Sequence, residues 1–349
     1  MNDCLTMKKI SVYFLLCVFI FCSCNNKNET STSVSVDSSF GKVELFAGTD
    51  TSIVNPQALV ERIGKNYKWC EGPVWVPSQK MLLFSAVREN KIYKWDGTDT
   101  PVSYLTPSGY TDTAFRDGEN GSNGLALDKE GKLLLCQSGN RQVVRMNAPL
   151  DSPKPVFIIL AKDYHGKKFN SPNDLVADSR NNIYFTDPIY GLPKHESDPT
   201  RELNFEGVYK ISNSGKLSLL IDSISRPNGI ALSPDEKVLY IGSSDNHTKW
   251  YAYQLDSNGN IKSGKILLDG YEMKEKATNM KTGADGFKTD RYGNIFSSGP
   301  DGINIISPEG KLLGLIRIYN KQTSNCAFNE TRDVLYVTAD DWVFRIKIK

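Results

Sequence analysis

The stretch RPNGIALSPDEKVLY, residues Arg226–Tyr240, contains the pattern that decides the fold. Asn228 is followed by a short run in which apolar residues alternate, then by a turn at Pro234–Lys237 and by a second apolar run. Alternation with a period of two is typical of β-strands, and Pro and Asp are frequent turn residues. The stretch therefore predicts two neighbouring strands with a polar residue at the start of the first.

This pattern occurs six times along the chain of 349 residues. The polar residues that start the copies are Glu71, Asn123, Asn173, Asn228, Asp285 and Asn325, and their separations are 52, 50, 55, 57 and 40 residues. Repeats of about this length are typical of a four-stranded propeller blade. A parallel β-helix is the competing repeat fold, but its repeats are shorter and would not need three turns per copy. We therefore predict an all-β protein, a six-bladed β-propeller with four-stranded blades.

The last repeat ends with the chain and has no evident fourth strand. The missing strand is predicted to come from Ala58–Ile63, before the first repeat, so that the two ends of the domain close the ring.

The first residues are typical of a targeting segment. Lys8 and Lys9 precede an apolar run, Ile10–Phe21, that is too short to span a bilayer comfortably. The run ends in Phe-Cys-Ser-Cys, which resembles the lipobox of bacterial lipoproteins, with Cys24 as the lipidation site. An ordinary secretory signal is the alternative, and Met7 is an alternative start. We expect an exported bacterial lipoprotein, anchored to a membrane through lipid at the periplasmic face or the cell surface.

Composition divides the chain into three parts. Residues 1–23 are predicted to be the signal peptide, residues 24–42 a flexible tether rich in Asn, Ser and Thr, and residues 43–349 the propeller domain. The domain has three cysteines, too few for a disulfide framework, and they are predicted to be buried small apolar residues. With 42 basic and 40 acidic residues, the net charge of +2 gives no field that would attract nucleic acid. A small-molecule ligand and a monomer are expected.

The starts of the innermost strands converge on the axis of a propeller, so the six polar residues should meet there. Each has a side-chain oxygen and none has a thiolate or imidazole. Oxygen donors with two negative charges favour Ca²⁺ or Mg²⁺ over copper, and Ca²⁺ is the expected ion, with Mg²⁺ and Zn²⁺ left open. Asn-Gly and Asp-Gly also occur as plain turn residues, and Asn325 is the member most compatible with a purely structural role.

Four longer stretches carry a family resemblance: EGPVW (Glu71–Trp75), FNSPNDLVADSRNNIYFTDPIYGL (Phe169–Leu192), RPNGIALSPDEKVLY (Arg226–Tyr240) and GADGFKTDRYGNIF (Gly283–Phe296). They resemble the SMP-30/gluconolactonase/LRE-like family of six-bladed propellers, within the calcium-dependent phosphotriesterase superfamily. The resemblance implies Glu71, Asn228 and Asp285 as metal ligands and Asn173 beside or on the metal. One departure is Ser138, which stands where many gluconolactonases have His, so a role for an imidazole at that point is in doubt.

The resemblance implies metal-dependent opening of a sugar lactone or related ester. The cation would polarise the lactone carbonyl, with Asp285 as the candidate general base and Asn173 orienting the carbonyl or a hydroxyl group. Asn123 and Arg141, in the second blade, are expected to bind sugar hydroxyls or a carboxylate. A Ser-His-Asp triad is not evident, since the sequence has three histidines and no Gly-x-Ser-x-Gly motif.

Two other functions stay open at this point. A related esterase or phosphotriesterase would use the same metal, because fold and ligands do not fix the chemistry. A non-catalytic propeller that binds carbohydrate or protein would use the metal only to hold the blades together.

Overall fold

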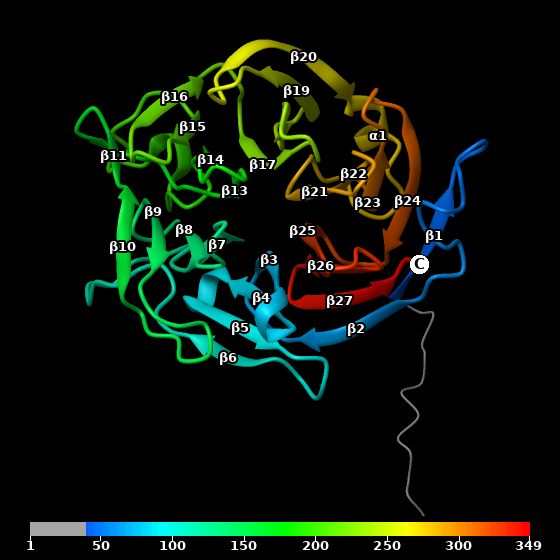
Figure 1. Ribbon diagram of the computed structural model, residues 1–349, viewed down its shortest axis with the longest axis horizontal. Helices are drawn as coiled ribbons and strands as arrows, with labels where there is room; N and C mark the ends of the chain where they lie inside the picture. The colour runs from blue at the N-terminus through cyan, green and yellow to red at the C-terminus, as the bar shows by residue number, and fades with distance from the viewer. Residues whose placement is uncertain (1–39) are drawn as a thin grey trace, which may run out of the picture. The chain divides into compact units, whose positions relative to one another are not determined.

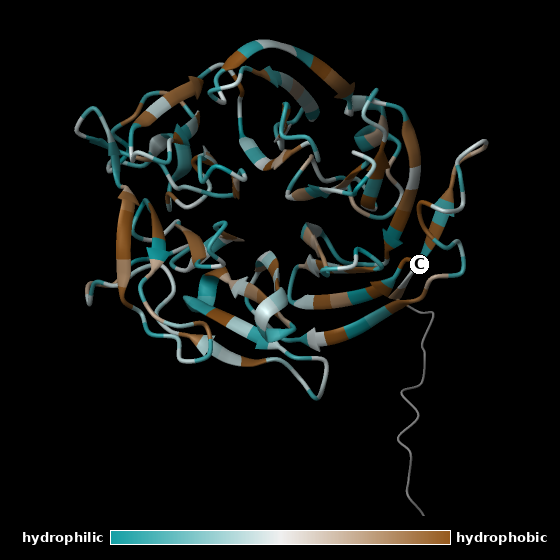
Figure 2. Ribbon diagram, in the orientation of Figure 1, coloured by the Kyte–Doolittle hydropathy of each residue, from teal (hydrophilic) through white to brown (hydrophobic). Residues whose placement is uncertain are grey.

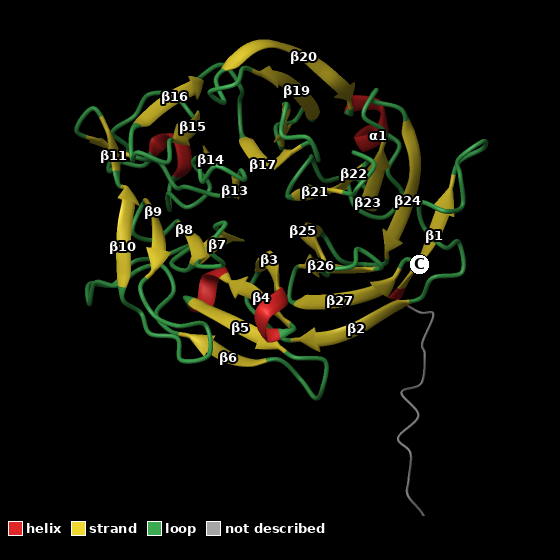
Figure 3. Ribbon diagram, viewed as in Figure 1, coloured by secondary structure: helices red, strands yellow, loops and turns green. Residues whose placement is uncertain are grey.

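Residues 40–349 are the part of the chain that this computed structural model describes. They form six antiparallel sheets around a common axis (Figure 1), which confirms the predicted six-bladed, all-β propeller. Within this part of the chain the one α-helix is α1 (Tyr271–Glu275), and strands and loops make up most of the ring (Figure 3).

The first and second blades follow each other along the chain. The first contains β3 (Cys70–Val76), β4 (Met81–Ala86), β5 (Lys91–Trp95) and β6 (Val102–Leu105), and the second contains β7 (Ser122–Leu127), β8 (Leu133–Gln137), β9 (Gln142–Met146) and β10 (Phe157–Ala161). The third contains β13 (Leu175–Ala177), β14 (Ile183–Asp187), β15 (Gly207–Ile211) and β16 (Leu217–Ile221), and the fourth contains β17 (Pro227–Leu232), β18 (Val238–Ser243), β19 (Lys249–Leu255) and β20 (Ile261–Asp269). The fifth contains β21 (Phe287–Thr289), β22 (Ile295–Gly299), β23 (Gly302–Ile306) and β24 (Leu312–Ile318), and the sixth contains β25 (Thr323–Phe328), β26 (Val334–Ala339) and β27 (Trp342–Lys347). The connections contain the hairpin of β11 (Asp163–Tyr164) and β12 (Lys167–Lys168) and short 3-10 turns at Pro77–Gln79, Val87–Glu89 and His195–Ser197.

The sixth blade is completed by a strand from the other end of the domain. Strand β2 (Val60–Lys65) pairs with β27, with Val60 opposite Ile346. The predicted closure of the ring is therefore confirmed, and the segment that supplies the fourth strand is the expected one. Closure of this kind removes the open edge that the last repeat would otherwise leave.

The fifth blade has a further strand that the repeat pattern does not predict. Strand β1 (Gly41–Leu45) pairs with β24 and makes this sheet five-stranded. Arg317 on β24 joins the two strands because its guanidinium contacts Glu44 at 3.1 Å and Asp301 at 2.6 Å. A five-residue strand with its own ion pair covers the outer edge of the blade.

The turns between the first and second strands of several blades follow one chemical rule. In the second, third and fifth blades an aspartate accepts hydrogen bonds from backbone N–H groups two and four residues further on, and these aspartates are Asp128, Asp178 and Asp290. The side chain thus closes the turn in place of a backbone carbonyl. In the fourth blade the turn at Ser233 is closed by its own hydroxyl, which accepts from the Val238 N–H.

The hydrophobic core consists of six clusters, each of which joins two neighbouring blades. Val76 and Leu83 of the first blade, for example, pack with Leu125 and Leu135 of the second. Strand segments are largely apolar and many of the connecting loops are polar (Figure 2). Because a buried Leu or Val contributes about 1.5–3 kcal/mol, the contacts between blades hold the ring together.

The three cysteines of the domain lie in these clusters. Cys70, Cys136 and Cys326 are fully buried and free, and burial raises the pKa of each thiol. The prediction that they are buried apolar residues is confirmed.

The predicted signal peptide, the lipidation site Cys24 and most of the predicted tether lie outside the described residues. Among residues 40–349 no helix has the length and apolar character needed to cross a membrane.

Candidate functional site

Five of the six predicted polar residues line one cavity of about 180 Å³ at the axis. Those five are Glu71, Asn123, Asn173, Asn228 and Asp285, and the other lining residues are Trp69, Glu119, Tyr190, Ser244, Gly283 and Gln322. The five come from five different blades and none is more than 8% exposed. The predicted convergence therefore occurs, and it produces a site lined by buried polar side chains.

Irregularities in the innermost strands accompany this arrangement. The pairing of β3 with β4 shifts register between Glu71 and Val74, and that of β17 with β18 shifts between Pro227 and Ile230. An added residue of this kind bends a strand and changes the direction of a side chain. Glu71 and Asn228 thus leave the ordinary alternation of their strands at the end that lines the cavity.

The glycine after each of these two residues is needed for close approach between blades. A Cβ atom on Gly72 would lie 2.1 Å from the Asn123 carbonyl oxygen, and one on Gly229 would lie 2.2 Å from the Asp285 carbonyl oxygen. Backbone atoms at such distances cannot move aside independently. The Glu-Gly and Asn-Gly pairs therefore bring neighbouring backbones together at the axis, which is a different role from that of a hairpin turn.

Glu71 and Asp285, two of the three carboxylates that line the cavity, have little to neutralise them. Glu71 accepts a hydrogen bond from the Gly72 N–H at 3.0 Å, and Asp285 accepts one from the Gly286 N–H at 3.1 Å. Burial and the charge of Asp285 raise the pKa of Glu71 well above its ordinary value. Burial and the charge of Asp174 do the same to the pKa of Asp285. Two buried acids whose ionisation is disfavoured by burial and by neighbouring carboxylates are suited to share a cation.

The amide side chains leave oxygen atoms available in the same cavity. Asn228 donates from Nδ2 to the Ser244 hydroxyl at 2.8 Å, so its Oδ1 is the atom left for a ligand. Asn123 Oδ1 is buried and has no hydrogen-bond partner among the described residues. Buried polar atoms without partners are uncommon and call for an explanation.

This donor set fits a hard divalent cation. Three carboxylates and several amide oxygens, with no sulfur or imidazole lining the cavity, are the groups that Ca²⁺ prefers. No cluster of three or more His, Cys, Asp or Glu side chains with metal-binding geometry occurs among residues 40–349. The site would accordingly depend on amide oxygens as well as carboxylates, with Glu71, Asn173, Asn228 and Asp285 as the residues that would hold the ion.

Glu119 is a cavity residue that the repeat pattern did not identify. It belongs to the loop before β7, its Oε2 has no partner among the described residues, and burial raises its pKa. Trp69 and Tyr190 also line the cavity from positions outside the innermost strands. A residue in a loop has no equivalent in the other blades, so repeat spacing gave no signal for it.

Arg141 lies outside this cavity. Its Nε donates to the Phe169 carbonyl at 2.5 Å and its Nη1 donates to the Thr200 carbonyl at 2.8 Å. Ser138, at the position of the absent histidine, is buried and donates to the Pro172 carbonyl at 2.9 Å. Neither residue is among those that line the site. Of the two second-blade residues predicted to bind the substrate, Asn123 and Arg141, Asn123 is the one that lines the cavity.

Asn325, the sixth polar residue, is engaged within the protein. Its Nδ2 donates to Asp174 Oδ2 at 3.3 Å, and its Oδ1 accepts from Lys288 Nζ at 3.3 Å. Lys288 Nζ also lies 3.7 Å from Asp174 Oδ2. These three side chains form a separate polar cluster, and the structural role considered for Asn325 agrees with its contacts.

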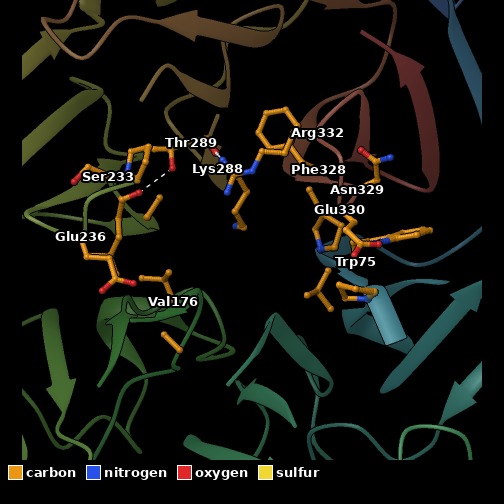
Figure 4. Close-up of a pocket in the computed structure, with 18 residues that line it drawn as sticks. Trp75, Val176, Ser233, Glu236, Lys288, Thr289, Phe328, Asn329, Glu330 and Arg332 are labelled. Carbon is orange, nitrogen blue, oxygen red and sulfur yellow. Dashed lines mark hydrogen bonds between the residues drawn. The ribbon is translucent and has the colours of Figure 1, made fainter. Parts of the chain in front are cut away.

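A larger cavity, of about 500 Å³, is formed by the opposite ends of the innermost strands (Figure 4). Its lining includes Trp75, Val176, Leu232, Lys288 and Phe328, and it contains none of the six polar strand starts. Lys288 projects into it in Figure 4. This cavity is larger than the one at the strand starts, but the convergent oxygen donors favour the smaller one as the reactive site.

Comparisons with known proteins agree with the fold and with the motifs at the strand starts. The sequence profile described as "SMP-30/Gluconolactonase/LRE-like region" matches residues 69–341. The gluconolactonase of Zymomonas mobilis is 37% identical over 317 residues, which cover 89% of this chain and 87% of that protein. Lactonohydrolase oryL of Aspergillus oryzae is 29% identical over 306 residues, which cover 79% of this chain and 67% of that protein.

A solved structure, described as a gluconolactonase of Xanthomonas campestris, superposes with a TM-score of 0.76 at 25% identity. The superposition covers 90% of this chain and 97% of that one. The profile match over most of the chain, the related sequence and the shared architecture lead to one conclusion: the chain belongs to the SMP-30/gluconolactonase/LRE-like family.

Proposed function

We propose that this protein is a metal-dependent hydrolase that opens a sugar lactone. The observation that carries the proposal is the meeting of Glu71, Asn228 and Asp285 in one cavity, where the two buried carboxylates of Glu71 and Asp285 lack a neutralising partner. Relatives described as gluconolactonase and lactonohydrolase support the choice of substrate class. The oxygen donors support Ca²⁺ as the ion.

A divalent cation in this cavity would supply Lewis-acid polarisation of the lactone carbonyl. Asp285 would accept the proton of the attacking water as the water oxygen bonds to the carbonyl carbon. The ring C–O bond then breaks, and the ring oxygen takes up the proton, which leaves a hydroxy acid. Asp285 lines the same cavity as Glu71 and Asn228, which would place it within reach of this proton.

Other cavity residues would position the substrate. Asn173 and Asn123 present amide groups for the carbonyl or hydroxyl oxygens, and Asn123 Oδ1 has no protein partner. Trp69 and Tyr190 line the same cavity and would restrict its width and the access of water.

The test is hydrolysis of glucono-1,5-lactone followed with a pH indicator, with the spontaneous rate subtracted. Removal of metal by a chelator should abolish turnover, and re-addition of Ca²⁺ should restore it. Asp285→Asn should lower the rate by about 10²- to 10⁴-fold, the usual contribution of a general base. Asp99→Asn, on an exposed loop, is the matched control.

Unchanged hydrolysis after chelation and in Asp285→Asn would contradict the proposal. Turnover of phosphotriesters with none of sugar lactones would instead favour the related hydrolase. Metal binding without turnover of either substrate would favour a binding propeller.

We also propose that the mature protein is monomeric and is held at a membrane by lipid on Cys24. The motif around Cys24 supports this anchor. Labelling cells with a fatty-acid analogue should mark the wild type and leave Cys24→Ser unlabelled. A labelled Cys24→Ser variant would rule out this site, and the mass of the detergent-free domain in solution tests the monomer.

A further inference from the structure

A separate cavity of about 690 Å³ lies on the second blade and is lined mainly by polar groups. Its lining residues are Tyr110, Thr111, Asp112, Arg116, Gly139, Asn140, Arg141, Lys168 and Thr200. Three of these side chains are cationic and one is a carboxylate. No ion pair within residues 40–349 involves Arg116, Arg141 or Lys168.

Arg141 is the buried member of this group. It is 8% exposed, and the acceptors of its hydrogen bonds are the neutral carbonyls of Phe169 and Thr200. Its Nη2 has no partner among the described residues. A guanidinium that is oriented by neutral acceptors and has no counter-ion bears an uncompensated charge, which an anion would offset.

Arg116 lines the same cavity and is likewise held by neutral acceptors. Its Nη1 donates to the Glu119 carbonyl at 2.8 Å and to Asn120 Oδ1 at 3.0 Å, and its Nη2 donates to the Gly191 carbonyl. Burial and then the charge of Arg141 lower the pKa of Arg116. The two guanidinium groups therefore repel each other. Asp112, the one carboxylate that lines the cavity, bonds to neither of them, and its Oδ1 accepts from the N–H groups of Thr113 and Ala114.

The nearby carboxylates are engaged by other donors. Asp198 accepts from the N–H groups of Thr200 and Lys194 and from the Thr200 hydroxyl. Glu202 accepts from the Lys168 N–H, and Asp187 accepts from two N–H groups of its own blade. They reduce the field of Arg141 at a distance but do not bond to its guanidinium.

We propose that the cavity of Arg116, Arg141 and Lys168 binds a small oxyanion, of the phosphate, sulfate or carboxylate class. Planar guanidinium groups present paired N–H donors that match such ions, and Lys168 adds an exposed charge at the rim.

The oxyanion is either a free ion or the acidic group of a larger ligand. Arg116 holds the backbone of Glu119, whose side chain lines the proposed metal cavity, so the two cavities share one loop. An acidic group on the substrate is therefore the second source of the anion. The assignment of the anion to a substrate group rests on the proposed lactone hydrolase function, whereas the binding of a free ion does not.

The test is calorimetric titration of the metal-free protein with inorganic phosphate, in a buffer without other oxyanions. Saturable binding is expected, and Arg116→Gln should weaken it by about tenfold, which corresponds to about 1.4 kcal/mol. Lys168→Gln should also lower the affinity for phosphate. Lys262→Gln, which removes an exposed charge from β20, is the matched control and should bind as the wild type does. These variants leave the buried Arg141 intact, and the melting temperature of each variant checks that it is folded.

Absence of phosphate binding in the wild type, or equal affinity in wild type, Arg116→Gln and Lys168→Gln, would overturn the proposal. Titration with 6-phosphogluconate separates the two sources. At least tenfold tighter binding than phosphate, weakened by Asn123→Ala, would assign the anion to a ligand that spans both cavities. Equal affinity for both compounds would assign it to a free ion. Phosphate binding that persists in a protein without lactonase activity would support the anion site and refute only the proposed function.

Discussion

The side-chain amide of Asn228 donates from Nδ2 to the hydroxyl oxygen of Ser244 at 2.8 Å. Ser244 directly follows β18, the strand that pairs with the strand carrying Asn228. The hydrogen bond fixes which end of the amide is the nitrogen, and so it leaves Oδ1 for the cavity that both residues line. A partner of this kind usually sets the orientation of a metal ligand.

Ser244→Ala should therefore weaken calcium binding by about 10- to 100-fold, the usual effect of losing such a partner. The free amide can rotate and present its nitrogen to the cation. Ca²⁺ affinity is measured by calorimetry on chelator-treated protein. Ser243→Ala is the control, because its hydroxyl donates to the Ser225 carbonyl and lies beside the same turn. Equal affinity in Ser244→Ala and Ser243→Ala would show that Ser244 does not position Asn228.

Glu71→Gln should stabilise the metal-free protein at pH 8. Burial and Asp285 raise the pKa of Glu71, so the stability that this group contributes is lost as pH rises. Removing the carboxylate should raise the unfolding free energy by about 1–2 kcal/mol and the melting temperature by a few degrees. Ca²⁺ should then raise the melting temperature of the wild type more than that of the variant. The exposed Glu309→Gln is the control, and a lower melting temperature for metal-free Glu71→Gln would contradict this account.

Lys288→Met should destabilise the protein by about 2–3 kcal/mol. The substitution keeps the length of the side chain but leaves Asp174, which is 1% exposed, without its nearest cation at 3.7 Å. Breaking a fully buried ion pair costs about 3–5 kcal/mol, and the partial exposure of Lys288 reduces this figure. Urea unfolding of Lys288→Met, Asp174→Asn and the double variant gives the coupling energy. Additive effects of the two substitutions would mean that Lys288 does not neutralise Asp174.

Acid should weaken the attachment of β1 to the fifth blade through Asp301. Burial would raise the pKa of Asp301, but the N–H groups of Met280, Thr278 and Asn279 together with Arg317 outweigh it and lower the pKa from 3.8 to about 2. A lowered pKa means that stability is present above pH 4 and is lost as pH falls through 2. Asp301→Asn should thus cost about 1–2 kcal/mol at pH 6, and the difference from the wild type should shrink towards pH 2.

Urea unfolding of the two proteins at several pH values measures this difference. Asp99→Asn, in an exposed loop, is the control for the loss of a negative charge. A difference between Asp301→Asn and wild type that stays constant down to pH 2 would exclude the proposed ionisation.

The six-bladed ring and most of its site could be predicted because the evidence for them is local and repeated. Alternating apolar residues follow Glu71, Asn123, Asn173, Asn228 and Asp285 at blade-length spacing, and equivalent positions in a closed ring meet at its axis. The closing strand β2 could be predicted as well, because the last repeat has three strands and a four-stranded blade needs one more.

Other features depended on contacts that no repeat encodes. Glu119 enters the cavity from a loop, and β1 adds to an outer edge through a short segment with one ion pair. Asn325 resembles the other strand starts in sequence, but Asp174 and Lys288 bind its amide away from the cavity. Arg141 has its guanidinium held by the carbonyls of Phe169 and Thr200, outside the site where its position in the second blade suggested it would lie.

The sequence by itself determined the number of blades, their order and the oxygen-rich residues at the strand starts, because a period of two and a fixed repeat length are properties of the chain alone. Only the tertiary structure decided which of those residues face the cavity and which are bound by a neighbour. That choice depends on distances between side chains from different blades, such as the 3.3 Å between Asn325 and Asp174. Such distances exist only after the ring has closed.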